Sequence, residues 1–241
     1  MSCYPGTAKN PVANLIPGLE LGLVETLDRQ LQEGDGVMVP HKRVSKIDST
    51  LPPYLIIHMV RFEWKKANDA AGTKACRAKV LKRIEYPHLL DLYPFCTDSL
   101  KHVLDKGRIQ DEQRRAKELH QSSDQRMDTK PVDQAKPVDQ AKPVDEAKPV
   151  EQGTNDEALA DDPINYADGT YQLKSVVTHK GRTVEEGHYI CWNWSHQDQS
   201  WTKLDDDKSS KVAKDAIDLQ GGLADGHVPY ILLFERKGIF Q

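Results

Sequence analysis

Closely spaced cysteine pairs are missing from this sequence. Zinc ribbons and small disulfide-rich domains both depend on such pairs, often as Cys-x-x-Cys motifs. The four cysteines are instead widely scattered, as Cys3, Cys76, Cys96 and Cys191. We therefore expect reduced thiols, no bound metal and no other cofactor.

Long apolar runs and a strong net charge are missing as well. No run of apolar residues approaches the roughly 18 of a membrane-spanning helix, and the N-terminus lacks the apolar core of a signal peptide. The formal charge is only -4 and the pI is near 6.1, which gives no electrostatic reason for nucleic-acid binding. We expect proteins or small molecules as partners, no membrane and no nucleic acid. The expected location is the cytoplasm, with the nucleus as a second compartment.

The chain is too polar to form one compact unit throughout. Its 38% apolar residues can build a core, but 29% of the residues are charged and the mean hydropathy is -0.66, so part of the chain is expected to be disordered. A six-residue repeat, Lys130-Pro-Val-Asp-Gln-Ala, returns at Lys136, Lys142 and Lys148. A proline every six residues excludes a helix or a central strand, so the repeat predicts an extended, solvated linker.

The repeat divides the chain into three segments. We expect one ordered part at residues 1–109, a disordered insertion at 110–163 and a second ordered part at 164–241. The pattern of Asp111 to His120 is compatible with a helix that extends toward the repeat.

The two ordered parts have mainly strand patterns. Alternating, β-branched and aromatic side chains predict strands over residues 54–62, 80–87, 171–179, 187–194, 201–205 and 229–234. A helical pattern over residues 18–32 ends before a Gly-Asp-Gly turn at 34–36. The sequence therefore predicts an α+β fold with an antiparallel-rich sheet, a few helices and one long insertion.

The most informative stretch is Tyr171-x-Leu-x-Ser-Val-Val-x-His179-x-Gly181-x5-Gly187-His188-Tyr189. It predicts a strand, a loop bounded by two glycines and a second strand that begins with an imidazole. The next predicted strand ends in Asp205-Asp206-Asp207. A neutral imidazole needs an acceptor on one nitrogen while the other nitrogen takes a proton from a nucleophile, so Asp205 could orient His188. Nine histidines and 37 acidic residues allow many accidental pairs, so the spacing alone is weak support.

Several motifs together resemble the ubiquitin-specific proteases, a family of papain-like cysteine proteases that cleave after the ubiquitin C-terminus. Residues 171–189 resemble their histidine box, 51–62 their central strand, 201–206 their acidic box and 230–234 their closing strand. The combination of residues 51–62, 80–96 and 222–234 looks most like the proteasome-associated branch of that family. Both ordered parts, 1–109 and 164–241, would then belong to one catalytic domain.

The resemblance implies a papain-like α+β fold of the ubiquitin-specific protease type. It would contain the antiparallel half, known as the palm and fingers, without the helical half, known as the thumb. The resemblance also implies that His188 is the general base, that Asp205 orients it and that Asp206 gives polar support.

The same resemblance implies a set of binding residues next to the histidine. Residues 182–186 take the place of a loop that hangs over the ubiquitin tail, so the expected ubiquitin-binding residues are Arg182, Glu186, Gly187 and Tyr189. The implied partners are ubiquitin or its conjugates, with the proteasome as a further candidate.

The nucleophile of that family is missing. It lies in a box of the type Gly-x-x-Asn-x-Gly-Asn-Thr-Cys-Tyr, which does not occur in the 241 residues. Cys3 and Tyr4 match only the end of the box, and Cys191 is three residues from His188, which places the two on opposite faces of a strand. Without a thiolate beside the imidazole there is no acyl transfer, so we expect this chain to be inactive by itself.

Three functions remain open from the sequence. The chain could be the C-terminal part of a thiol-dependent deubiquitinase, a non-catalytic module that binds ubiquitin or the proteasome, or a fragment without activity. An in-frame cysteine box in the genome upstream of Met1 would favour the first, saturable ubiquitin binding the second, and a lack of cooperative unfolding the third.

Overall fold

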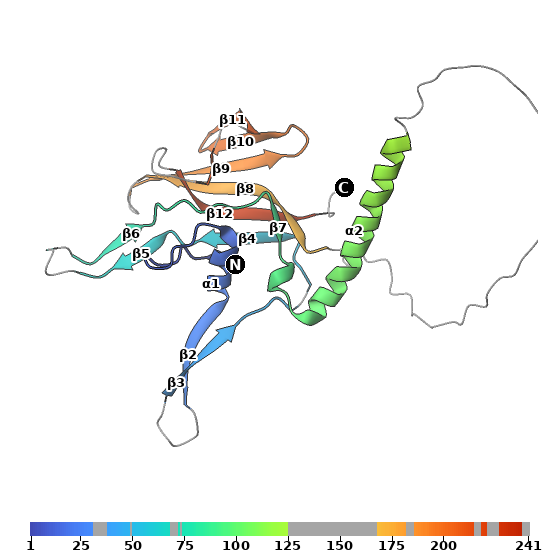
Figure 1. The fold of residues 1–241 in the computed structure, drawn as a ribbon. Coiled ribbons are helices and arrows are strands. Elements are labelled where there is room, and N and C mark those ends of the chain that lie inside the picture. The colour runs from blue at the N-terminus through green and yellow to red at the C-terminus, as the bar shows by residue number, and fades with distance from the viewer. Residues whose placement is uncertain are drawn as a thin grey trace, which may run out of the picture.

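The computed structural model describes residues 1–30, 38–48, 50–67, 72, 74–124, 168–181, 186–214, 218–220 and 227–237. Within these ranges, strands predominate and gather mainly into one twisted sheet, with helices beside it (Figure 1).

The large sheet has eight strands in the order β1-β4-β12-β8-β9-β10-β11, and β7 also pairs with β8. Every pairing is antiparallel except that of β1 with β4. The strands are β1 (Ser2–Cys3), β4 (Tyr54–Met59), β7 (Leu89–Asp91), β8 (Thr170–Lys180), β9 (His188–Ser195), β10 (Ser200–Asp205), β11 (Lys208–Ala213) and β12 (His227–Arg236). Because β12 lies between β4 and β8, the two ordered parts of the sequence form one sheet.

One face of this sheet carries the core. Along β4 the buried side chains alternate with exposed ones, as a strand period of two requires. Leu232 and Phe234 of β12 are fully buried, and the three tryptophans expected in strands are at most 6% exposed. The buried tryptophans are Trp192, Trp194 and Trp201. Each large apolar side chain buried here stabilises the fold by roughly 1.5 to 3 kcal/mol.

Helix α1 (Leu15–Gly22) closes the N-terminal end of the core with Leu15 and Leu19, both almost fully buried. It lies close to β1, because a Cβ at Gly18 would be 2.3 Å from Sγ of Cys3. The glycine is therefore required for this approach of helix to strand.

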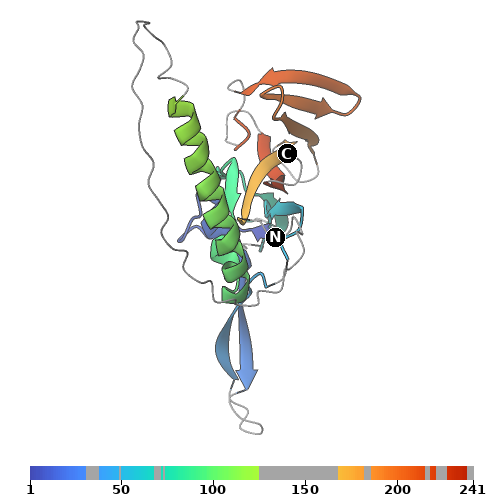
Figure 2. The ribbon, with the colours of Figure 1, turned by 90° about the vertical axis from the view of Figure 1, so that its right-hand side faces the viewer.

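Two hairpins stand apart from the sheet. They are formed by β2 (Val24–Gln30) with β3 (Met38–Val44), and by β5 (Phe62–Lys65) with β6 (Cys76–Lys79). The first hairpin points away from the sheet in both views (Figure 1, Figure 2).

A short 3-10 turn, η2 (Tyr93–Phe95), leads into the long helix α2 (Asp98–Asp124). Leu100 and Leu104 anchor its first turns in the core. The helix crosses the boundary expected at residue 110 and includes the segment 111–120 that has a helical pattern, while the repeats that start at Lys130 lie outside the described residues. None of the helices in the described ranges combines the length and the apolar composition of a membrane span.

Most of the strands expected from the sequence are confirmed, namely those in residues 54–59, 171–179, 188–194, 201–205 and 229–234. The expected strand over 54–62 is divided, because β4 ends at Met59 and Phe62 begins a hairpin of another sheet. Arg61 lies between them, 1% exposed, and donates to the carbonyls of Pro229 and Lys82.

Two expected elements are wrong. Residues 80–87 form no named strand and make only a single bridge, from Glu85 to Asn14, because their backbone binds loops while Ile84 and Tyr86 enter the core. The helix expected over 18–32 ends at Gly22, and the next residues pair with β3. The turn expected at 34–36 lies outside the described residues.

Two adjacent isoleucines test the burial pattern of β4. Ile57 is 0% exposed and Ile56 is 59% exposed. We expect Ile57→Ala to lower the free energy of unfolding by about 2 to 5 kcal/mol, since it leaves a cavity in the core. The matched change Ile56→Ala should cost less than about 0.5 kcal/mol. Chemical denaturation of both variants is the measurement, and equal losses would contradict the assigned faces.

Candidate active site

Strand pairing brings the candidate histidine and its acidic partner together at neighbouring ends of two adjacent strands. His188 is the first residue of β9 and Asp205 is the last residue of β10, and the two strands are antiparallel with Leu204 opposite Cys191. The start of β9 therefore lies beside the end of β10. Asp206 follows in the turn to β11 with a positive φ of 53°.

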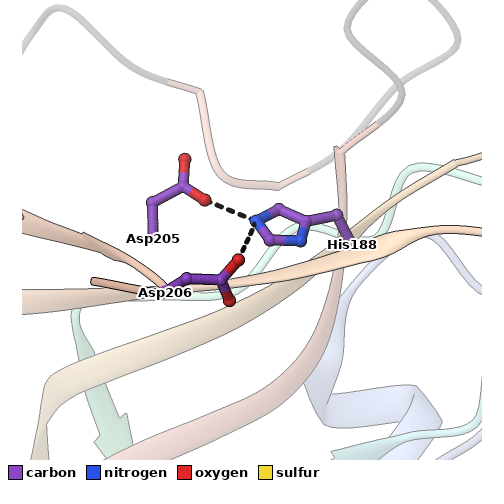
Figure 3. A group of neighbouring side chains, drawn as sticks. All are labelled: His188, Asp205 and Asp206. Carbon is purple, nitrogen blue, oxygen red and sulfur yellow. Dashed lines mark hydrogen bonds and ion pairs between the residues drawn. The ribbon is translucent and has the colours of Figure 1, made fainter. Parts of the chain in front are cut away.

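Figure 3 shows the imidazole of His188 pointing toward both carboxylates. Its Nε2 is hydrogen bonded to Oδ1 of Asp205 and lies 4.0 Å from Oδ2 of Asp206. An ionised carboxylate only accepts hydrogen bonds, so Nε2 must carry the proton. In the neutral imidazole the other nitrogen, Nδ1, then carries a lone pair, and it forms no hydrogen bond within the described residues. This arrangement leaves His188 able to take a proton from a neighbouring group.

Asp205 is held as an anion by two donors. Nζ of Lys203 lies 2.5 Å from Oδ2 of Asp205 and His188 occupies the other oxygen. The lysine, and then the histidine, lower the pKa of Asp205 from 3.8 to about 2. Because this pKa is depressed, the stabilisation from these contacts is present above pH 3.8 and is lost as the pH falls through about 2.

The same three side chains are a group whose geometry could hold a metal ion. The candidate ligand atoms of His188, Asp205 and Asp206 lie within 4.8 Å of one another. The ammonium of Lys203 already neutralises Asp205, and its positive charge opposes a cation at that position. The donor set therefore suits an oriented imidazole better than a metal.

The loop before His188 has a glycine at each end. Gly181 has a φ of 137°, a backbone conformation that residues with a side chain rarely adopt. A Cβ at Gly187 would lie 2.1 Å from Nε2 of His179. Of the expected ubiquitin-binding residues, Arg182 lies outside the described residues, whereas Glu186 and Gly187 are exposed. Tyr189 is 49% exposed.

A group of rings that sequence reasoning missed surrounds Tyr189. The ring of Tyr189 lies 4.7 Å from His179 and 5.6 Å from Tyr230, and Phe62 lies 5.5 Å from Tyr230 (ring centroids). These rings come from β9, β8, β12 and β5. Phe62 and Tyr230 lie in sequence motifs that predicted strands. Their aromatic side chains were the only feature of the sequence that could have indicated this group of rings.

None of the four cysteines, all of which lie in the described part of the chain, is hydrogen bonded to His188. Cys3 is fully buried in β1, and three strands separate it from β9, which is about 19 Å at the usual strand spacing. Burial raises its pKa to about 11. Cys191 is on the opposite face of β9 from His188, and burial raises its pKa too. The expectation that neither thiol serves the imidazole agrees with this geometry.

A family model for ubiquitin carboxyl-terminal hydrolase matches residues 28–234. The chain belongs to the ubiquitin carboxyl-terminal hydrolase family. The match spans both ordered parts of the chain.

Relatives in the family extend well beyond this chain. Ubiquitin carboxyl-terminal hydrolase 14 of Caenorhabditis elegans is 29% identical and aligns with 100% of this chain but 45% of its own length. Ubiquitin carboxyl-terminal hydrolase 7 of Arabidopsis thaliana is 30% identical, with 94% and 44% covered. Ubiquitin carboxyl-terminal hydrolase 6 of Schizosaccharomyces pombe is 31% identical, with 90% and 46% covered. The chain thus spans less than half the length of these relatives.

A solved structure of the SAGA DUB module bound to monoubiquitin has a similar fold. The TM-score is 0.51 at 17% identity, and the match covers 98% of this chain and 34% of that chain. The expected α+β fold of the ubiquitin-specific protease type is confirmed. Within the described ranges the chain contains the sheet half of that fold and not the helical half.

Two lysines on neighbouring strands test the control of the acidic partner. Replacing Lys203 by Met removes a donor at 2.5 Å, so the pKa of Asp205 should rise from about 2 toward 3.8. Carboxyl-carbon NMR titration measures this shift. The matched change Lys211→Met should raise the pKa of Asp198, whose carboxylate Lys211 binds at 3.0 Å, and should leave Asp205 unchanged. An unshifted Asp205 in the Lys203 variant would contradict the geometry.

The contact beneath Gly187 gives a second test. Gly187→Ala should cost about 1 to 3 kcal/mol of unfolding free energy, because the added methyl overlaps the ring of His179. In combination with His179→Ala the penalty should become smaller without disappearing, because the backbone carbonyl oxygen of Lys180 remains 2.7 Å from the added methyl; a double-mutant cycle by urea denaturation measures the difference. Strictly additive effects of the two changes would show that the ring is not the obstacle.

Proposed function

We propose that this chain carries the histidine side of a thiol-dependent hydrolase that releases ubiquitin from protein conjugates. The observation that carries the proposal is the imidazole of His188, whose Nε2 is bound by Asp205 and whose Nδ1 has no hydrogen-bond partner among the described residues. Membership of the ubiquitin carboxyl-terminal hydrolase family supports the reaction class.

In the proposed reaction, a thiol transfers its proton to Nδ1 of His188, and the thiolate attacks the carbonyl carbon at the ubiquitin C-terminus. The imidazolium then returns the proton to the departing amine, leaving a thioester that water hydrolyses with the same base. Asp205 stays ionised and stabilises the imidazolium. Its low pKa keeps it in this state throughout the neutral range.

We propose that the thiol comes from outside these 241 residues, because none of their four cysteines, all of which lie in the described part of the chain, is hydrogen bonded to His188. By itself the chain should therefore bind ubiquitin without cleaving its conjugates. Tyr189 follows His188 in β9, so its half-exposed ring and the neighbouring rings lie on the opposite face of the strand from the imidazole, where they offer a surface for ubiquitin. Such non-catalytic binding is the second candidate function, and the proteasome remains a further proposed partner.

A ubiquitin derivative with a cysteine-directed group at its C-terminus tests the lack of a nucleophile. We expect no covalent adduct with the purified chain by mass spectrometry. An adduct at any of the four cysteines would overturn the proposed division between this chain and the thiol.

Titration with labelled ubiquitin tests binding separately. We expect saturable binding, weakened roughly tenfold or more by Tyr189→Ala, because exposed aromatic anchors carry much of the energy of an interface. The control Tyr54→Ala removes a ring of similar exposure, 44%, from the start of β4, which pairs with Glu235 at the other end of β12 from Tyr230, and should leave the affinity unchanged. A failure of ubiquitin to bind at all would remove the proposed binding of ubiquitin by this chain.

A further inference from the structure

A lysine from a separate hairpin reaches the loop that precedes His188. Lys79 is the last residue of β6, and its Nζ donates to the carbonyl oxygen of Gly181 at 2.6 Å and to that of His179 at 3.1 Å. Hydrogen bonds from an ammonium group are about twice as strong as neutral ones. The contact joins residues about a hundred positions apart in the chain.

The two carbonyl groups flank the residue that pairs with His188. Lys180, between them, is the last residue of β8 and lies opposite His188 in the antiparallel pair with β9. A change in the backbone at Lys180 therefore shifts the backbone of His188, with which it pairs between β8 and β9. Lys79 holds the backbone on both sides of this point.

The other end of the loop rests on the ring of His179. Gly187 lies so close that a Cβ there would be 2.4 Å from Cε1 of His179 and 2.1 Å from its Nε2. The ring itself is 3% exposed and is edge-on to Phe62 of β5, at 6.2 Å between ring centroids. The β5–β6 hairpin thus contacts the loop region at two places: Lys79 binds the backbone carbonyls of His179 and Gly181, and Phe62 packs against the ring of His179.

We propose that Lys79 is a positioning residue for His188. By binding the carbonyl groups of His179 and Gly181, it fixes the backbone on which Gly187 rests and so sets the imidazole against Asp205. The catalytic meaning of this role depends on the proposed function, but the structural effect does not. The hairpin and the loop should then behave as one unit.

Amide hydrogen exchange of the 241-residue chain, without ubiquitin, tests this coupling. In Lys79→Met we expect the amides of residues 187–190 to exchange at least about tenfold faster, the scale of losing a hydrogen bond from a charged donor. The Nε2 proton of His188, which is hydrogen bonded to Asp205, should exchange faster by NMR. Lys79→Arg should restore much of both signals, since a guanidinium can bind the same carbonyls.

Two controls separate this local role from general packing. Lys65→Met removes an exposed lysine from the neighbouring strand of the same hairpin and should change neither signal. The amide of Ile57 in β4 reports global opening and should be unaffected in Lys79→Met. Unchanged exchange at 187–190, or a uniform acceleration that includes Ile57, would overturn the proposal. Because no step uses ubiquitin, a failure of ubiquitin binding would leave this result intact.

Discussion

The antiparallel pairing of β9 with β10 is the constraint on which the site depends. It brings the first residue of one strand beside the last residue of the other, so that His188 and Asp205 form a hydrogen bond across the edge of the sheet. Lys203 adds a positive charge to the carboxylate from the same strand, two residues away and therefore on the same face. Strand register thus places the imidazole beside Asp205.

Sequence reasoning predicted the part of the candidate site that is encoded locally. His188 and Asp205 lie in short boxes whose residue types and spacing are distinctive, and the strands around them alternate clearly. Lys79 gave no such signal, because it acts on carbonyl groups about a hundred residues away. The two wrongly predicted elements also depend on distant contacts. Residues 24–30 pair with another strand instead of continuing the predicted helix. Residues 80–87 bind loops and pack into the core instead of joining a sheet.

In the proposed reaction the sheet half provides the base and its orientation, and the thiol comes from elsewhere. Two of the cysteines, Cys3 and Cys96, are fully buried, and the half-buried Cys191 faces away from the imidazole. Burial raises the pKa of all three thiols, which opposes their reactivity at neutral pH. A thiol outside this chain is consistent with the alignment, in which the chain covers only 44% to 46% of the length of three members of its family. The proposed reaction therefore needs a thiol placed against Nδ1 of His188.

The tautomer of His188 is the most direct measure of this account. Long-range proton–nitrogen NMR of the chain at neutral pH, with His188→Gln to assign the ring, reports which nitrogen carries the proton. The structure predicts a proton on Nε2, directed at Asp205, and an unprotonated Nδ1. A ring protonated on Nδ1 alone, or one that averages between the two tautomers, would contradict the proposed role of the Asp205 hydrogen bond.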